Sequence, residues 1–169
     1  MKKSNAKNIS EFNSLEARGW IIVVTSEIER FIDSIIMDFI KINDQKRDFF
    51  VNVLLGGDTI FFGAKIKILI QILKNIDKEK KFQNLIENLR KINRIRNIFA
   101  HCYSDDVIIY DKNLGGKATK VEEVLFKVSK NSKGDTENVL FKKYLKEFDS
   151  YYNEEFRENL KELKSIVKS

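Results

Sequence analysis

The sequence predicts an all-α fold, an antiparallel helical bundle of four to five helices with a small β-hairpin at about 107–129 before the last helix. Apolar residues recur at steps of three and four along most of the chain, which is the spacing of one helix face. The 169 residues contain no proline, so nothing of that kind interrupts a long helix. Only one segment has short β-type runs around a glycine-containing turn.

We expect residues 1–10 to form a basic flexible tail, because they carry three lysines and no acid. Residues 11–169 should then form a single helical domain, since no linker-like stretch divides them. The first predicted helix covers 14–42. Its inward positions recur at helical spacing: Trp20, Val24, Ile28, Phe31, Ile35 and Phe39.

Two further helices are predicted in the middle of the chain. A short one covers 46–55 and ends at Gly56-Gly57. The next covers 60–76, with Asp58 or Thr59 as its N-cap. Its inward residues are expected to be Phe61, Phe62, Ile66, Leu69, Ile72 and Leu73.

A fourth helix is predicted over 79–102, and its apolar stripe contains Phe82, Leu85, Ile86, Leu89 and Ile92. Two strands at 107–111 and about 121–129 should pair through a turn containing Gly115-Gly116. The last helix is expected from Asp135 or Thr136 to about 167.

Composition excludes several classes of protein. One cysteine and one histidine cannot form a zinc site or an internal disulfide, so no metal or cofactor is expected. No apolar run approaches the ~20 residues of a membrane span, and the N-terminus lacks the apolar core of a signal peptide. We therefore expect a cytoplasmic protein that does not contact a membrane.

The net charge of +6 is unevenly distributed. Residues 61–103 hold ten bases and three acids. An excess of this size favours a polyanion such as RNA as a partner. A lysine-rich face that is simply solvated explains the same charge equally well.

The basic segment ends in the run Arg96-Asn97-Ile98-Phe99-Ala100-His101, which contains the only histidine. Helical spacing from Ile92 puts Arg96 near the middle of the apolar stripe, where a charge needs a partner or a ligand. Asn97 is four residues before His101, so the two side chains can hydrogen-bond and fix the imidazole. Arg96 offers a permanent charge suited to phosphate, and His101 offers a group that exchanges protons near neutral pH. Together they could cleave RNA without a metal.

Helix geometry complicates this reading, because five residues turn a helix by roughly 140° from Arg96 to His101. Either the helix loosens near Ala100 or a homodimer through this helix brings two motifs together. Structural explanations stay open: Arg96 could pair with an acid such as Glu27 or Asp33, and His101 could cap the helix.

The pattern Arg96-Asn97-x-x-Ala100-His101 resembles the motif of the HEPN domain superfamily, and Tyr103 matches the tyrosine two positions after histidine in some of its toxins. The resemblance implies a HEPN-like helical bundle that usually dimerises. It implies a metal-independent endoribonuclease with Arg96, Asn97 and His101 as catalytic residues, acting as a bacterial toxin or anti-phage defence effector. It also implies an antitoxin protein as partner, with Tyr103 lining the site or accepting an inhibitory nucleotidyl group.

The run Gly57-Asp58-Thr59-Ile60-Phe61-Phe62-Gly63-Ala64-Lys65-Ile66 is similar to a helix start in the mannitol-repressor branch of the same superfamily. That branch is associated with regulation. The alternative function is therefore a non-catalytic HEPN protein that binds a partner, with Arg96 and His101 serving the structure.

Overall fold

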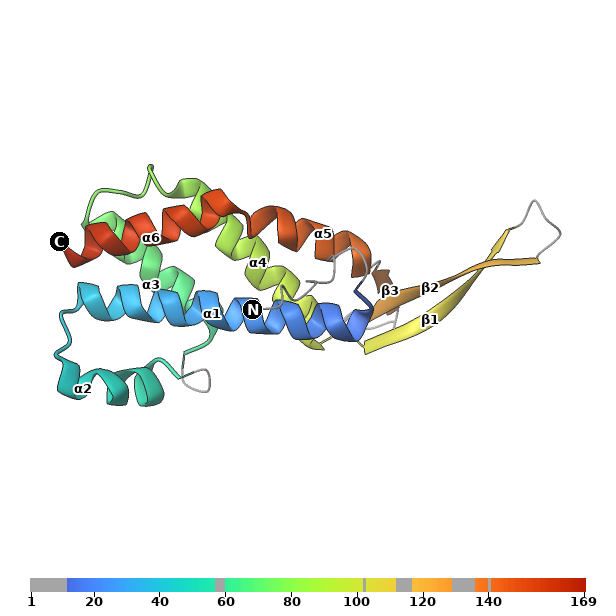
Figure 1. Cartoon of the computed structure of the whole chain (residues 1–169), viewed down its shortest axis with the longest axis horizontal. Helices are drawn as coiled ribbons and strands as arrows, with labels where there is room; N and C mark the ends of the chain where they lie inside the picture. Colours follow the sequence, from blue (N-terminus) through green and yellow to red (C-terminus); the bar gives the residue numbers. More distant parts are fainter. Residues whose placement is uncertain (1–11, 57–59, 102, 112–116, 129–135, 140) are drawn as a thin grey trace, which may run out of the picture. The chain divides into compact units, whose positions relative to one another are not determined.

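The computed structural model describes residues 12–56, 60–101, 103–111, 117–128, 136–139 and 141–169. This part of the chain is mainly helical, which confirms the predicted class (Figure 1). The α-helices are α1 (Ser14–Phe39), α2 (Asp44–Phe49), α3 (Phe62–Asn75), α4 (Gln83–His101), α5 (Phe141–Tyr151) and α6 (Glu154–Lys168). A π-helical turn, η2 (Phe50–Leu54), continues α2.

The chain divides into two compact units. The first consists of Met1–Ile22 with Ile95–Phe148, and the second of Val23–Arg94 with Asp149–Ser169. Helices α1, α4 and α5 contribute residues to both units. The expectation that residues 11–169 form a single domain stays a prediction.

Named contacts join the helices of the second unit. Lys65 on α3 pairs with acids on α1, and Lys81 before α4 pairs with Glu162 on α6. The Lys164 ammonium on α6 lies 5.1 Å from the Phe31 ring on α1. The apolar residues between these contacts are buried, and they form the core of this unit: Ile28, Ile32, Ile35, Leu69, Leu73, Leu85, Leu89, Phe156 and Leu163.

In the first unit, aromatic rings connect α1 to α5. Trp20 lies between Phe12 and Phe148, with ring centroids 6.2 and 5.2 Å apart and edge-to-face geometry. Phe148 is completely buried. Trp20, which was predicted to face inward, is half-buried.

The first unit also contains a three-stranded antiparallel sheet in the order β1 (Tyr103–Asp111), β2 (Lys117–Val128) and β3 (Thr136–Val139). Strands β1 and β2 cover most of the segment in which a hairpin is predicted, and β1 begins earlier, at Tyr103. The predicted Gly115-Gly116 turn lies outside the described residues. The pairing shifts register between Ile109 and Tyr110.

The predicted last helix is wrong in two respects. Thr136–Val139 pairs with the end of β2 and is not helical. The helical part is also divided, because Asn153 leaves the helical conformation and its Oδ1 accepts a hydrogen bond from the Phe156 amide at 2.8 Å. This N-cap starts α6 anew.

The other helix boundaries differ by a few residues. Helix α1 ends at Phe39, three residues early, and Lys41 adopts a left-handed conformation (φ 53°) that stops it. Helix α2 starts at Asp44, where Asn43 caps it. Phe61 was predicted inward but is 72% exposed, since it precedes α3 and does not share its helical register. Helix α3 begins at Phe62, two residues later than predicted, and its N-cap is Phe61. The predicted caps, Asp58 and Thr59, lie outside the described residues, and the helix does not start next to them.

Candidate functional site

The apolar stripe of α4 turns around the helix toward its C-terminal end. Ile95 and Phe99 are each 0% exposed and continue the stripe from Ile92 by steps of three and four residues. Arg96 is only half-buried. The prediction that Arg96 occupies the middle of the buried stripe is therefore wrong, because the stripe passes through its neighbour Ile95 and leaves Arg96 at the edge.

Arg96 donates a hydrogen bond from Nη1 to Asn97 Oδ1 at 3.1 Å. Asn97 and His101 are both exposed on the last two turns of α4. In the described part of the chain, no hydrogen bond joins Asn97 to His101, so the predicted bond is not formed. Asn97 orients the guanidinium rather than the imidazole.

This hydrogen bond reduces the angular separation between the Arg96 guanidinium and His101 around the helix. At about 100° per residue, Asn97 lies about 40° around the helix from His101, whereas Arg96 lies about 140° away. Since Asn97 accepts from Arg96, the guanidinium leans toward the side of the helix that carries His101. The three residues thus belong to one exposed helix end, with the charge and the imidazole still on separate sides.

Tyr103 begins β1, where it pairs with Phe126 of β2. Tyr103 is therefore part of a strand, and it does not lie on the helix that carries Arg96 and His101. Cys102 lies outside the described residues.

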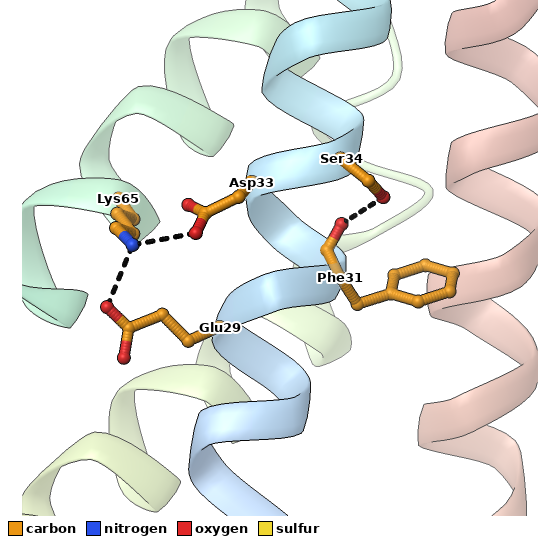
Figure 2. A network of polar contacts seen from close by, with 5 residues as sticks. All are labelled: Glu29, Phe31, Asp33, Ser34 and Lys65. Atoms are coloured by element: carbon orange, nitrogen blue, oxygen red, sulfur yellow. Dashed lines mark hydrogen bonds and ion pairs between the residues drawn. The ribbon is translucent and has the colours of Figure 1, made fainter. Parts of the chain in front are cut away.

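The structure also contains a buried charged cluster in the second unit that the sequence analysis missed. Lys65 on α3 lies between two acids of α1, with its Nζ 2.8 Å from Asp33 Oδ2 and 2.9 Å from Glu29 Oε1 (Figure 2). Lys65 is 2% exposed and Asp33 is 5% exposed. We call Lys65, Asp33 and Glu29 the buried triad.

Asp33 is incompletely satisfied within the buried triad. Its Oδ1 is buried and has no hydrogen-bond partner among the described residues. Burial raises the pKa of Asp33 above its ordinary value of 3.8, and the hydrogen bond and charge of Lys65 only partly oppose this. The partner of Asp33 is thus Lys65, and not Arg96 as the structural explanation of the motif supposed.

A sequence signal for the buried triad did exist. Lys65 falls three residues after Phe62 and four before Leu69, which places it in the buried stripe of α3. Asp33 likewise falls among the buried residues Ile32 and Ile36 of α1. Two opposite charges on two apolar stripes indicate a buried ion pair, because an unpaired charge there would be very costly.

Neither the helix end nor the buried triad is built like a metal centre. Among the described residues, no three histidine, cysteine or acidic side chains are grouped so that they could hold an ion. The searched helices include none that is both long and apolar enough to cross a bilayer.

The chain matches no protein-family model, and neither a curated protein nor a solved structure is similar to it. The interpretation of the site therefore rests on its residues.

Proposed function

We propose that the chain is a metal-independent endoribonuclease of HEPN type, with a HEPN-like helical bundle that dimerises through α4. The observation that carries the proposal is the exposed end of α4, where Asn97 holds the Arg96 guanidinium at 3.1 Å and His101 follows on the last turn. A permanent charge and a proton-exchanging group there are the minimum for RNA cleavage.

In the proposed reaction, the ribose 2′-oxygen attacks the adjacent phosphorus while His101 accepts its proton. The bond from phosphorus to the 5′-oxygen breaks, leaving a 2′,3′-cyclic phosphate on one fragment. The 5′-oxygen takes up a proton, from water or from the imidazolium of a second copy. Arg96 stabilises the extra negative charge on the phosphoryl oxygens of the transition state.

A homodimer would bring an arginine and a histidine together, although Arg96 and His101 of one chain lie on different sides of α4. In a symmetric interface formed by two α4 ends, the arginine of one protomer can face the histidine of its partner. The one cleft shared by the two protomers would then hold two proton-exchanging groups, although each chain has one histidine.

The biological role that we propose is that of a bacterial toxin or anti-phage defence effector, restrained by an antitoxin protein. The basic excess of residues 61–103 supports RNA as the substrate. Expression of the wild-type chain should arrest growth, and the Arg96→Ala variant should not.

The direct test uses purified protein and RNA in EDTA. We expect the wild type to cut RNA, and His101→Ala to lose about 10²–10⁴-fold in rate, the usual contribution of a general acid or base. Arg30→Ala removes an exposed arginine of α1 outside the motif and serves as the control. Intact RNA with the wild type, or equal cutting by His101→Ala, would refute the proposal.

The alternative is a non-catalytic HEPN protein similar to the mannitol-repressor branch. Its support comes from Lys65, which lies in the run Phe62-Gly63-Ala64-Lys65-Ile66 that is similar to this branch. Lys65 holds α3 to α1 through two ion pairs, so its role is structural and it performs no chemistry at the surface. In that case, alanine at Arg96 or His101 should weaken dimerisation or stability, and the RNA should remain intact. Sedimentation of the two variants beside the cleavage assay separates the functions.

A further inference from the structure

We propose that the free edge of strand β1 binds an extended, lysine- or arginine-rich segment of a partner protein, which joins the sheet as an additional strand. The sheet lies entirely within the first unit, and its strands follow the order β1-β2-β3 (Figure 1). The proposal does not rest on ribonuclease activity, because Arg96, Asn97 and His101 belong to α4 and not to the sheet.

Strand β1 is an edge strand along its whole length. All nine residues of Tyr103–Asp111 pair with β2, and within the described residues no strand lies on the other side of β1. Successive residues of a strand direct their N–H and C=O groups alternately to its two sides, so about half of these groups in β1 face the free side. A row of such groups is a template for another strand, and protein domains bind extended segments of their partners in this way.

The middle of the β1–β2 pair holds uncompensated negative charge. Asp106 is directly opposite Glu123, and like charges in this position destabilise a pair of strands. Asp105 and Glu122 lie on the two neighbouring rows, so three successive rows carry four acids and no base. The complementary pairs of the sheet lie away from this stretch: Asp111 with Lys117, and Lys127 with Glu137. An added strand with basic residues at the acidic rows would remove the repulsion.

The charge also selects the edge and its occupant. Strand β1 carries three aspartates and no base, whereas the part of β2 that β3 leaves open, Lys117–Val124, has two bases and two acids. A second copy of the chain is disfavoured at this edge, since its β1 would add three more aspartates. The run Val107–Ile109 follows the acids and favours β-branched residues in the added strand. The occupant is therefore a segment with basic residues opposite Asp105 and Asp106 and apolar residues beside them.

The experiment uses the full-length protein and synthetic peptides of the length of β1. The first peptide alternates lysine with valine, the second has glutamate in place of each lysine, and the third has proline in place of each valine. Fluorescence anisotropy measures binding at low ionic strength, and hydrogen exchange with mass spectrometry locates it. We expect only the lysine–valine peptide to bind, because the second peptide is repelled and the third cannot donate a ladder of hydrogen bonds. Binding should slow amide exchange in β1 and leave α3 unchanged.

A double variant tests the role of the acids. Asp105→Asn with Asp106→Asn should weaken binding about three- to tenfold, the effect of two exposed ion pairs. The sheet itself should not be weakened, since the change removes the repulsion between Asp106 and Glu123. Glu154→Gln with Glu155→Gln removes two adjacent exposed acids of α6 and should bind normally.

Four results would overturn the proposal. The first is no binding of the lysine–valine peptide at millimolar concentration, and the second is equal binding of the lysine–proline peptide, which would show attraction by charge alone. The third is unchanged binding by the double variant or protection outside β1. The fourth is full protection of β1 without peptide, which would show that the chain itself covers this edge.

Discussion

Replacing Lys65 with methionine should be among the most destabilising single changes in the second unit. Methionine keeps much of the length and the apolar stem of lysine, so little cavity forms. The change removes the cation that contacts both Asp33 and Glu29. It therefore leaves Asp33, which is 5% exposed, as a buried carboxylate without its counter-charge.

The distances give the size of the effect. At an effective dielectric constant of about 20, charges 2.8 Å and 2.9 Å apart attract by about 6 kcal/mol each. The cost of desolvating an ammonium that is 2% exposed offsets much of this gain. Glu29 is 20% exposed and can turn to water, so the loss falls mainly on Asp33. Breaking such a pair costs about 3–5 kcal/mol in free energy of unfolding.

Urea unfolding followed by far-UV circular dichroism measures this free energy. The double variant Lys65→Met with Asp33→Leu should recover most of the loss, because an apolar pair does not contain an uncompensated charge. A loss below about 1 kcal/mol for Lys65→Met, or a double variant no more stable than the single one, would contradict an electrostatic origin of this stabilisation.

The pH dependence gives a second measurement on the same residue. Burial raises the pKa of Asp33 in the folded protein, so the folded state binds this proton more tightly than the unfolded state. The resulting stability is fully present below the ordinary value of 3.8 and is lost as the pH rises through the raised pKa. Relative to Asp33→Asn, the wild type should lose stability as the pH increases above about 3.8. A constant difference, or one of opposite sign, contradicts a raised pKa.

Two further predictions concern the helices, and thermal or urea unfolding measures both. A Cβ at Gly63 would lie 3.3 Å from Asn93 Nδ2, so Gly63→Ala should change stability by no more than about 0.5 kcal/mol, whereas Gly63→Leu should cost about 1–3 kcal/mol. Equal stability of the two variants would show that α3 and α4 do not approach closely here. Asn153→Ala should cost about 1 kcal/mol by removing the cap to the Phe156 amide, while Asn153→Asp keeps an acceptor and should be nearly neutral. An equal loss in both would exclude capping as the cause.

Periodicity predicts the helices well because their core positions are really buried. The stripes read from α1, α3 and α4 contain Ile28, Leu69 and Leu89, all in the core. Boundaries are harder, since they depend on single backbone events such as the left-handed Lys41. The strand Thr136–Val139 depends on pairing with the end of β2, the preceding strand, and the pattern of its own four residues does not indicate that pairing.

The candidate site could be predicted in composition but not in contacts. The spacing of Arg96 and His101 identifies the helix end, yet the choice between Ile95 and Arg96 as the buried residue depends on how the stripe turns. Asn97 had two neighbours within reach, and it bonds to the arginine rather than to the histidine. Local spacing allows both bonds, so only the packing around α4 decides between them.

The chain places its ionisable side chains in two opposite environments, buried and exposed, and this difference makes the functional tests interpretable. Lys65 is buried and held by two carboxylates, so its loss must appear in the free energy of unfolding. His101 is exposed at a helix end, where a substitution changes stability by no more than the few tenths to about 2 kcal/mol of a helix-dipole interaction. If His101→Ala abolishes RNA cleavage while its unfolding curve stays close to that of the wild type, the lost activity comes from chemistry. If the two fall together, the histidine serves the structure, and the catalytic role proposed for it is refuted.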